Sequence, residues 1–442
     1  MLIKKKIQSI LFNFKNILFA YSGGIDSTVL LYNLVKLRKK YPFIIRAIHI
    51  NHNLNKKSNY WTKFCFSQCK KLNVLFIHKN IYINKKKNIE ECARKKRYQV
   101  FKKIIKNNEV LVTAHNLDEQ CETFFLSLKR GSGPKGLSGM STIKIIYNFK
   151  IFRPFLNISK NDIINYAIKK KINWIEDPSN KDIKYDRNFL RNIILPKIIN
   201  RWPFFQKTLF RSIRNCSEQE KLLHNLIKPI LMKLIQKNNS LFISPLYDFD
   251  MIKRNFIIRK WIEYNKYYYM PSRKLLDIIW KEIICCKNNN PHIKIGEYVI
   301  RKYKNYLFCI KYFPNLKKNI LIWNNSKKPL ILPNNLGILT IIHYKNYEKK
   351  LIYIRKPKNN EIIYIKFNNP IEKYYFNNSK YKKNINNIWK NLNIPEWEKE
   401  QIPLLFYNEK LIVDLENKLI TQYGQIDVLE KNNFFIYFQK KH

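Results

Sequence analysis

Glycine is concentrated in two short segments of this chain, and one of them has the residue types of a phosphate-binding loop. The chain has nine glycines in 442 residues, and six of them are Gly23, Gly24, Gly131, Gly133, Gly136 and Gly139. Glycine lets a backbone approach a ligand closely, and the amides at a helix N-terminus attract anions. We therefore predict that a phosphate group such as pyrophosphate binds at Ser22, Gly23, Gly24, Ile25, Asp26 and Ser27.

Asp26 is unexpected in such a loop because its charge repels a phosphate. It is explained if it holds Mg²⁺ or caps the helix that follows. The loop contains no Gly-Lys-Ser/Thr, which excludes the kinase type of phosphate loop, and Gly-x-Gly-x-x-Gly is also absent. The alternative is a capped helix after an ordinary turn.

The composition limits the class of protein. A hydrophobic content of 45% argues against a disordered chain, and no uncharged apolar stretch approaches the roughly 18 residues of a membrane helix. The basic start lacks a small-residue cleavage site, so we expect no signal peptide. The eight cysteines form no Cys-x-x-Cys pair, which favours reduced thiols and a cytoplasmic protein. A net charge of +53 is compatible with RNA or DNA as a partner.

The elements that must position the loop alternate between short apolar runs and helical patterns. Apolar runs at 17–21, 44–50, 74–78 and 109–114 alternate with helical patterns at 26–38, 58–72, 88–106 and 117–129. This order predicts an α/β fold with a doubly wound parallel sheet, whose ligands bind at the carboxyl ends of the strands. We predict a catalytic domain over 1–215, a helical middle domain over 216–330 and a small α+β C-terminal domain over 331–442, with a linker at 324–336.

Ser22-Gly23-Gly24-Ile25-Asp26-Ser27 resembles the pyrophosphatase loop of ATP pyrophosphatases, which adenylate a substrate oxygen and release pyrophosphate. Further segments resemble one branch of that group, the tRNA(Ile)-lysidine synthetase family. These segments are Ile89–Tyr98, Ala114–Thr123 with Leu128–Gly133, Trp174–Asn180 with Tyr185, Arg187, Asn188 and Arg191, Met270–Arg273, Ile394-Pro395 and Pro403–Phe406. The chain departs from the family where Asn116 replaces a usual His, where Glu119 replaces a usual Asp, and around Val413-Asp414.

The resemblance implies a reaction. ATP, with Mg²⁺, adenylates the carbonyl oxygen on carbon 2 of the wobble cytidine in an isoleucine tRNA that has a CAU anticodon. The ε-amine of free L-lysine then displaces AMP, which yields lysidine. Such a site must hold magnesium and pyrophosphate, bind a cation and exclude water.

This reaction gives roles to further residues. Asp118 and Glu122 lie one helical turn apart and would bind the ammonium of lysine or position magnesium; a solvated acidic helix start is the alternative. Arg94, with Arg97, would neutralise phosphate charge during adenylation, unless these are ordinary surface charges. The loop from Arg130 to Gly139, which includes Lys135, would close over nucleotide and RNA or serve as a plain connector. The residues that we predict to contact RNA are Arg130, Lys135, Arg187 and Arg191.

Two other functions fit parts of the sequence. A tRNA thiolase would use the same loop, but thiolation requires a cysteine pair or an iron–sulfur site, and no Cys-x-x-Cys exists. A non-catalytic RNA-binding protein with an inactive nucleotide fold is disfavoured by the intact loop and its Asp26.

Overall fold

The chain folds into two compact units, Met1–Leu226 and Ile227–His442. The computed structural model describes residues 14–53, 57–82, 89–146, 148–265, 271–286, 290–324, 328–342, 351–367, 370–376, 379–426 and 433–440. Met270, which belongs to one of the motifs above, lies outside these residues. Each unit has hydrophobic cores of its own.

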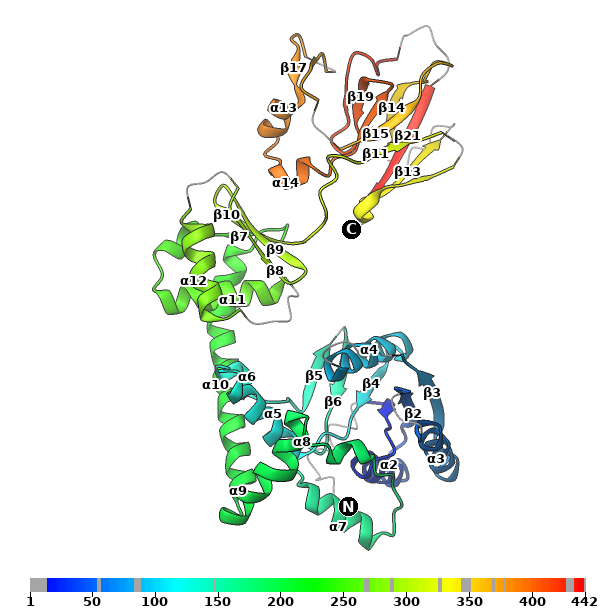
Figure 1. Ribbon diagram of the computed structural model, residues 1–442, viewed down its shortest axis with the longest axis vertical. Coiled ribbons are helices and arrows are strands. Elements are labelled where there is room, and N and C mark those ends of the chain that lie inside the picture. Colours follow the sequence, from blue (N-terminus) through cyan, green and yellow to red (C-terminus); the bar gives the residue numbers. More distant parts are fainter. Residues whose placement is uncertain are drawn as a thin grey trace. The chain divides into compact units, whose positions relative to one another are not determined.

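The first unit is built on a six-stranded sheet with the order β3-β2-β1-β4-β6-β5 (Figure 1). All neighbouring pairs are parallel except β5 and β6, which are antiparallel. The strands are β1 (Asn16–Ala20), β2 (Ile44–Asn51), β3 (Leu75–Asn80), β4 (Glu109–Val112), β5 (Ile143–Ile146) and β6 (Phe149–Phe152). The predicted doubly wound sheet is confirmed, with one antiparallel strand added at its edge.

Helices cover both faces of this sheet. Ile17 and Phe19 of β1 pack into one core with α2, α3 and α7, whereas Leu18 faces a second core that α4 closes. Because successive strand residues point to opposite faces, a strand buried on both sides has a continuous apolar sequence. The helices of the unit are α2 (Ile25–Arg38), α3 (Ser58–Lys71), α4 (Ile89–Ile104), α5 (Leu117–Lys129), α6 (Pro134–Leu137), α7 (Lys160–Lys169), η1 (Pro178–Lys181), α8 (Asp186–Phe189), η2 (Leu190–Ile194), α9 (Leu195–Arg201) and the start of α10 (Phe205–Leu234).

The strand order reverses between β1 and β4. The chain runs outward from β1 through β2 to β3 and then returns to the other side of β1. Ligands of open α/β sheets bind at the carboxyl ends of the strands at such a reversal. The loop of Ser22–Ser27 follows β1 directly, and His115 and Asn116 follow β4.

The second unit contains a helical part and two packed sheets. Helices α11 (Met251–Tyr264), α12 (Arg273–Ile278) and η4 (Ile279–Ile284) share a core with the antiparallel sheet β7-β10-β9-β8. Further along, the sheets β11-β15-β18-β19-β20 and β12-β13-β21-β14 enclose a common core. The remaining elements are β7 (Leu241–Phe242), η3 (Ser244–Tyr247), β8 (His292–Ile295), β9 (Tyr298–Tyr303), β10 (Tyr306–Lys311), β11 (Ile320–Ile322), β12 (Leu330–Ile331), η5 (Pro333–Asn335), β13 (Gly337–Ile342), β14 (Ile352–Arg355), β15 (Ile363–Lys366), β16 (Lys373–Tyr374), β17 (Lys383–Asn384), α13 (Ile385–Asn391), α14 (Glu396–Lys399), β18 (Leu404–Tyr407), β19 (Lys410–Asp414), β20 (Leu419–Ile420) and β21 (Asn433–Lys440).

Several details differ from the sequence expectations. The segment expected as a linker, 324–336, instead contributes β12, which pairs with β13. The helical middle part also contains β8, β9 and β10, and β9 and β10 are joined at Lys304, which has a positive φ of 51°.

The three-domain division itself stays a prediction. In the described part of the chain, no helix is long and apolar enough to cross a membrane.

Candidate active site

The two adjacent glycines of the β1–α2 loop have different requirements. Gly23 has a φ of +84°, and a Cβ there would lie 2.9 Å from Sγ of Cys65 on α3. Gly24 has φ −69° and ψ 163°, which any residue adopts. A Cβ on Gly24 would meet nothing closer than Oγ of Ser22, at 3.6 Å. The fold therefore requires glycine at position 23, whereas a Cβ at position 24 would make only ordinary van der Waals contacts.

The loop presents hydrogen-bond donors at the start of α2. No side chain caps the start of this helix. The first-turn amides, which have no partners within the helix, therefore receive no hydrogen bond from a capping side chain. The hydroxyls of Ser22 and Ser27 are 3.0 Å apart, and the Ser27 hydroxyl donates to the Gly24 carbonyl at 2.9 Å. This arrangement of amides and hydroxyls is suited to an anion.

Asp26 joins the carboxyl ends of β1 and β4 through a small polar network. Its Oδ1 accepts a hydrogen bond from Nδ2 of Asn116 at 3.0 Å, and its Oδ2 lies 2.6 Å from the ammonium of Lys160. Asn116 also caps α5, because its Oδ1 accepts from the amide of Glu119 at 3.0 Å. The aspartate that we expected to hold magnesium is thus fixed by one amide and one cation.

Asp26 is suited to bind Mg²⁺ together with oxygens of the substrate. Mg²⁺ is usually bound by one or two carboxylates together with water and substrate phosphates. Among the described residues, no group of three or more His, Cys, Asp or Glu side chains could hold a metal ion by itself. Asp26 would therefore supply one ligand, and phosphate oxygens and water would supply the others.

Asp118 and Glu122 lie on the same face of α5 but have different surroundings. Oδ2 of Asp118 accepts from the backbone amide of Lys160 at 2.7 Å, and Oδ1 accepts from Nε2 of Gln206 at 2.8 Å. Glu122 is fully buried and forms a two-bond ion pair with Arg191, with distances of 2.7 and 3.1 Å. Burial raises the pKa of Glu122 to about 7, and pairing with Arg191 opposes this rise.

The charges of four arginines act on His115, which follows β4. Arg94 and Arg97 come from α4, Arg153 follows β6, and Arg187 belongs to α8. Burial, followed by the charges of these four arginines, lowers the pKa of His115 to about 3. His115 is therefore neutral at physiological pH. Arg153 is only 3% exposed, and its Nε has no hydrogen-bond partner among the described residues.

The residues that we predict to contact RNA have different environments. Arg130 ends α5 and is exposed, and Lys135 lies on the short helix α6. Arg187 and Arg191 both approach Glu122, at 3.8 and 2.7 Å. The structure thus brings Arg187 and Arg191 to the buried carboxylate of Glu122.

The glycine-rich segment at 130–139 is attached to α5. Gln120 donates from Nε2 to the carbonyl of Met140 and accepts from its amide at Oε1, both at 2.7 Å. Gly131 and Gly139 have positive φ values of 63° and 60°. A Cβ on Gly139 would lie 2.7 Å from Oε1 of Gln120. These contacts fix the end of the segment to the helix that carries Asp118 and Glu122.

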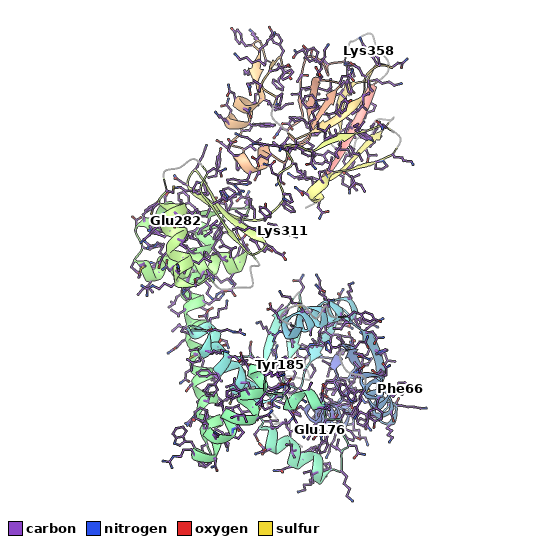
Figure 2. The ribbon with its side chains drawn as sticks, viewed as in Figure 1. Phe66, Glu176, Tyr185, Glu282, Lys311 and Lys358 are labelled. Carbon is purple, nitrogen blue, oxygen red and sulfur yellow. The ribbon has the colours of Figure 1, made fainter. Side chains whose placement is uncertain are left out.

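The Trp174–Asn180 motif packs on the phosphate loop. The amide of Ile175 donates to the Gly23 carbonyl at 3.0 Å, and its side chain would lie 3.3 Å from a Cβ at position 23. Figure 2 shows Glu176 and Tyr185 of this region in the first unit. Nδ2 of Asn188 holds the turn by donating to the carbonyls of Ser179 and Asp182, each at 2.9 Å. The motif therefore supports the loop and the helix that bears Arg187 and Arg191.

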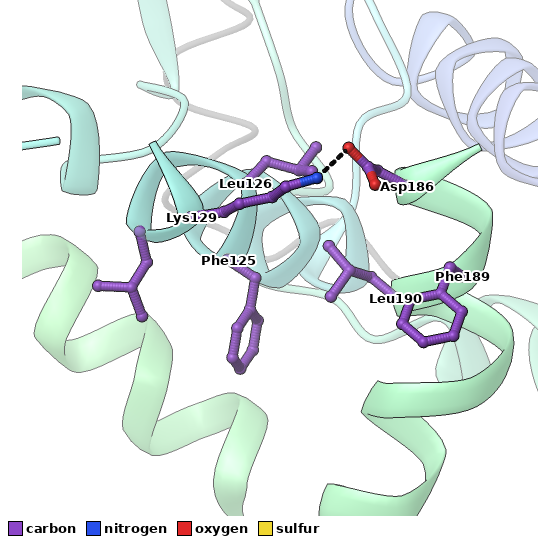
Figure 3. A pocket seen from close by; sticks show the side chains of 7 residues that line it. Phe125, Leu126, Lys129, Asp186, Phe189 and Leu190 are labelled. Carbon is purple, nitrogen blue, oxygen red and sulfur yellow. Dashed lines mark hydrogen bonds and ion pairs between the residues drawn. The ribbon is translucent and has the colours of Figure 1, made fainter. Parts of the chain in front are cut away.

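An apolar cavity of about 430 Å³ lies beside the site between α5, α8 and η2 (Figure 3). It begins one helical turn along α5 from Glu122. The charged residues in its lining are Lys129 and Asp186, an exposed ion pair at 2.8 Å. Because these groups are exposed and paired with each other, we assign the cavity no chemistry.

Comparison with known proteins shows the family of the whole chain. Residues 2–198 match the PP-loop domain, residues 241–308 the TilS substrate binding domain, and residues 363–413 the TilS substrate C-terminal domain. The tRNA(Ile)-lysidine synthase of Buchnera aphidicola subsp. Baizongia pistaciae is 46% identical over 407 residues, which are 91% of this chain and 91% of that protein. The chain belongs to the tRNA(Ile)-lysidine synthase family.

Other members of the tRNA(Ile)-lysidine synthase family are similar over comparable lengths. The enzyme of Buchnera aphidicola subsp. Acyrthosiphon pisum is 41% identical, covering 96% of this chain and 98% of that protein. The enzyme of Photorhabdus laumondii is 40% identical, covering 91% of this chain and 90% of that protein. The predicted resemblance to this family, made from the loop and the motifs along the chain, is confirmed.

Sequence reasoning missed four residues of the candidate site. Lys160, Arg153 and Gln206 have no signal in the sequence, because their partners are distant along the chain. Asn116 was noted only as a departure from the family. The spacing Asn-x-x-Glu from Asn116 to Glu119 is a capping-box pattern, and it would have identified their mutual hydrogen bonds.

Proposed function

We propose that this chain uses ATP to attach free L-lysine to carbon 2 of the wobble cytidine in an isoleucine tRNA with a CAU anticodon. Membership of the tRNA(Ile)-lysidine synthase family across 91% of the chain carries this proposal. A PP-loop domain that uses ATP and a substrate binding domain for tRNA are the two parts that the reaction needs. The products are lysidine, AMP and pyrophosphate.

In the first step the loop of Ser22–Ser27 binds the phosphates that leave as pyrophosphate. Its amides and hydroxyls face one point at the start of α2, and Asp26 would bind Mg²⁺ there. The bound ion would supply charge neutralisation for the phosphates. Arg94 and Arg97, whose charges act on His115 together with that of Arg153, would add positive charge where negative charge develops during adenylation.

In the second step Asp118 is our candidate for the carboxylate that binds the cation of lysine. It is partly exposed, and each of its oxygens retains a lone pair beyond the hydrogen bonds from Lys160 and Gln206. Glu122 would act differently from our first expectation, because both of its oxygens hold Arg191. We propose that Glu122 orients Arg191, and that Arg187 and Arg191 face the RNA with Arg130 and Lys135.

A test uses the full chain with ATP, magnesium, lysine and transcribed tRNA. We expect pyrophosphate release whose turnover depends on both tRNA and lysine. The tRNA product should be heavier by the mass of lysine less that of one water molecule. A methionine tRNA with the same CAU anticodon is the matched control. Lysine-independent sulfur transfer, or tRNA binding without any pyrophosphate release, would contradict the proposal.

A further inference from the structure

A lysine from outside the phosphate loop reaches into it. Lys160 is the first residue of α7, and its ammonium lies 2.6 Å from Oδ2 of Asp26, a residue 134 positions earlier in the chain. The side chains are 35% and 27% exposed, so both charged groups are open to an incoming ligand. The loop itself contains no lysine or arginine.

The backbone of Lys160 is held in place from two sides. Its amide donates to Asp118 at 2.7 Å, and Ser159 caps the same helix end by accepting from the amide of Asp162 at 3.1 Å. Ile163 and Ala167 of α7 are fully buried in the core that also contains α2. The position of the Lys160 backbone relative to the loop is therefore fixed, while its long side chain can turn at its end.

We propose that Lys160 supplies the cation that the loop lacks, and that it binds the β- and γ-phosphates of ATP. The Asp26–Lys160 ion pair holds the two charges together in the absence of ligand. With magnesium and ATP bound, the Asp26 carboxylate would be available to hold the metal, and the Lys160 ammonium would be free to bind the phosphate oxygens. This inference rests on the proposed adenylation chemistry.

The position of Lys160 suits the leaving group of that reaction. The substrate oxygen forms a bond to the α-phosphorus, and the bond breaks between that phosphorus and the oxygen that links it to the β-phosphorus of ATP. Pyrophosphate leaves with the electron pair of that bond, and its oxygen gains negative charge. A cation beside this oxygen lowers the barrier without transferring a proton. Lys160 would thus favour both binding of ATP and departure of pyrophosphate.

Binding of inorganic pyrophosphate with Mg²⁺ to the full chain, measured by calorimetry, tests this role separately from activity. Loss of a charge-assisted contact predicts that Lys160→Met weakens pyrophosphate binding about 10- to 100-fold. Lys160→Arg should recover most of the affinity. Lys169→Met, at the exposed end of the same helix, is the matched control and should bind like the unmodified chain.

Two results would overturn the inference. If Lys160 only neutralises Asp26, Lys160→Met will bind pyrophosphate with unchanged affinity and need less Mg²⁺. If Lys160→Arg is as weak as Lys160→Met while both are folded, the charge is not the active feature. Lys160→Gln provides a second neutral variant should the methionine variant not fold. The proposed function can fail separately. If the unmodified chain forms no lysidine while Lys160→Met still weakens pyrophosphate binding, the proposed function is refuted and the role of Lys160 stands.

Discussion

Alanine at position 23 should mainly lower the stability of the fold, whereas alanine at position 24 should mainly lower catalysis. At Gly23 the left-handed φ costs a residue with a Cβ about 1–2 kcal/mol, and the clash with buried Cys65 adds about 1–3 kcal/mol of overpacking. We therefore expect Gly23→Ala to lower the free energy of unfolding by about 2–5 kcal/mol. At Gly24 the backbone is extended and the nearest atom to a Cβ is 3.6 Å away. Gly24→Ala should change the free energy of unfolding by less than about 1 kcal/mol.

The catalytic effect of Gly24→Ala should be large despite the unchanged stability. A Cβ on Gly24 fits the protein without a clash but would keep phosphate oxygens away from the amides of the loop. Loss of one such donor costs about 2.7–4 kcal/mol, a factor of about 10²–10³ in rate. The assay is pyrophosphate release at saturating tRNA and lysine, together with urea unfolding of each variant and tRNA binding. Normal pyrophosphate release by Gly24→Ala, or destabilisation equal to that of Gly23→Ala, would refute the reasoning.

Three further predictions address other parts of the chain. Asp118→Asn should raise the KM for lysine strongly, by the equivalent of about 2–4 kcal/mol of binding free energy if the contact is desolvated. Its amide oxygen can still accept the hydrogen bond from the backbone amide of Lys160. A rise in the KM for ATP alone would contradict this. Because burial holds the pKa of His115 near 3 against an ordinary value of 6.5, the unfolded chain takes up more protons below pH 6.5. The free energy of unfolding should fall by about 2 kcal/mol from pH 6.5 to 5. In His115→Asn, the free energy of unfolding measured with urea should change less with pH over that range. Trp397→Ala removes a ring that lies 5.4 Å from Phe308 and 6.1 Å from Tyr303; it should raise the KM for tRNA several-fold and leave that for ATP unchanged.

The elements that carry the phosphate loop could be predicted because their signals are local. The apolar run at 17–21, the glycines and the helical pattern from Asp26 onward lie within about twenty residues. The helix expected at 117–129 has these bounds in the structure. Strands β5 and β6 were missed although the equally short β4 was predicted. All four β4 side chains are buried, whereas three of the four β5 side chains and one β6 side chain are exposed. Short strands of this kind depend on their neighbours in the sheet.

The contacts inside the site could not be predicted, because they join residues that are far apart in the chain. Glu122 and Arg191 were given separate roles, one with lysine and one with RNA, yet they form a single ion pair across 69 positions. Truncating Glu122 would remove the two-bond partner of the Arg191 guanidinium and leave it, among the described residues, only Glu119, at 4.0 Å. A loss of activity alone therefore cannot assign Glu122 to lysine binding. Residue types identified the chemistry of the site, and only the fold shows which charges are already paired.

The pairing has a consequence for how the two steps of the reaction are connected. On one turn of α5, Asp118 holds the backbone of Lys160, whose ammonium reaches Asp26 in the phosphate loop. On the next turn, Glu122 holds Arg191. Asn116 at the start of the same helix binds Asp26 directly. Helix α5 therefore carries the groups that fix the ATP loop together with those proposed to receive lysine and RNA. On our proposal, release of pyrophosphate frees Lys160 to return to Asp26. The charge beside Asp118 then changes at the stage when lysine must attack.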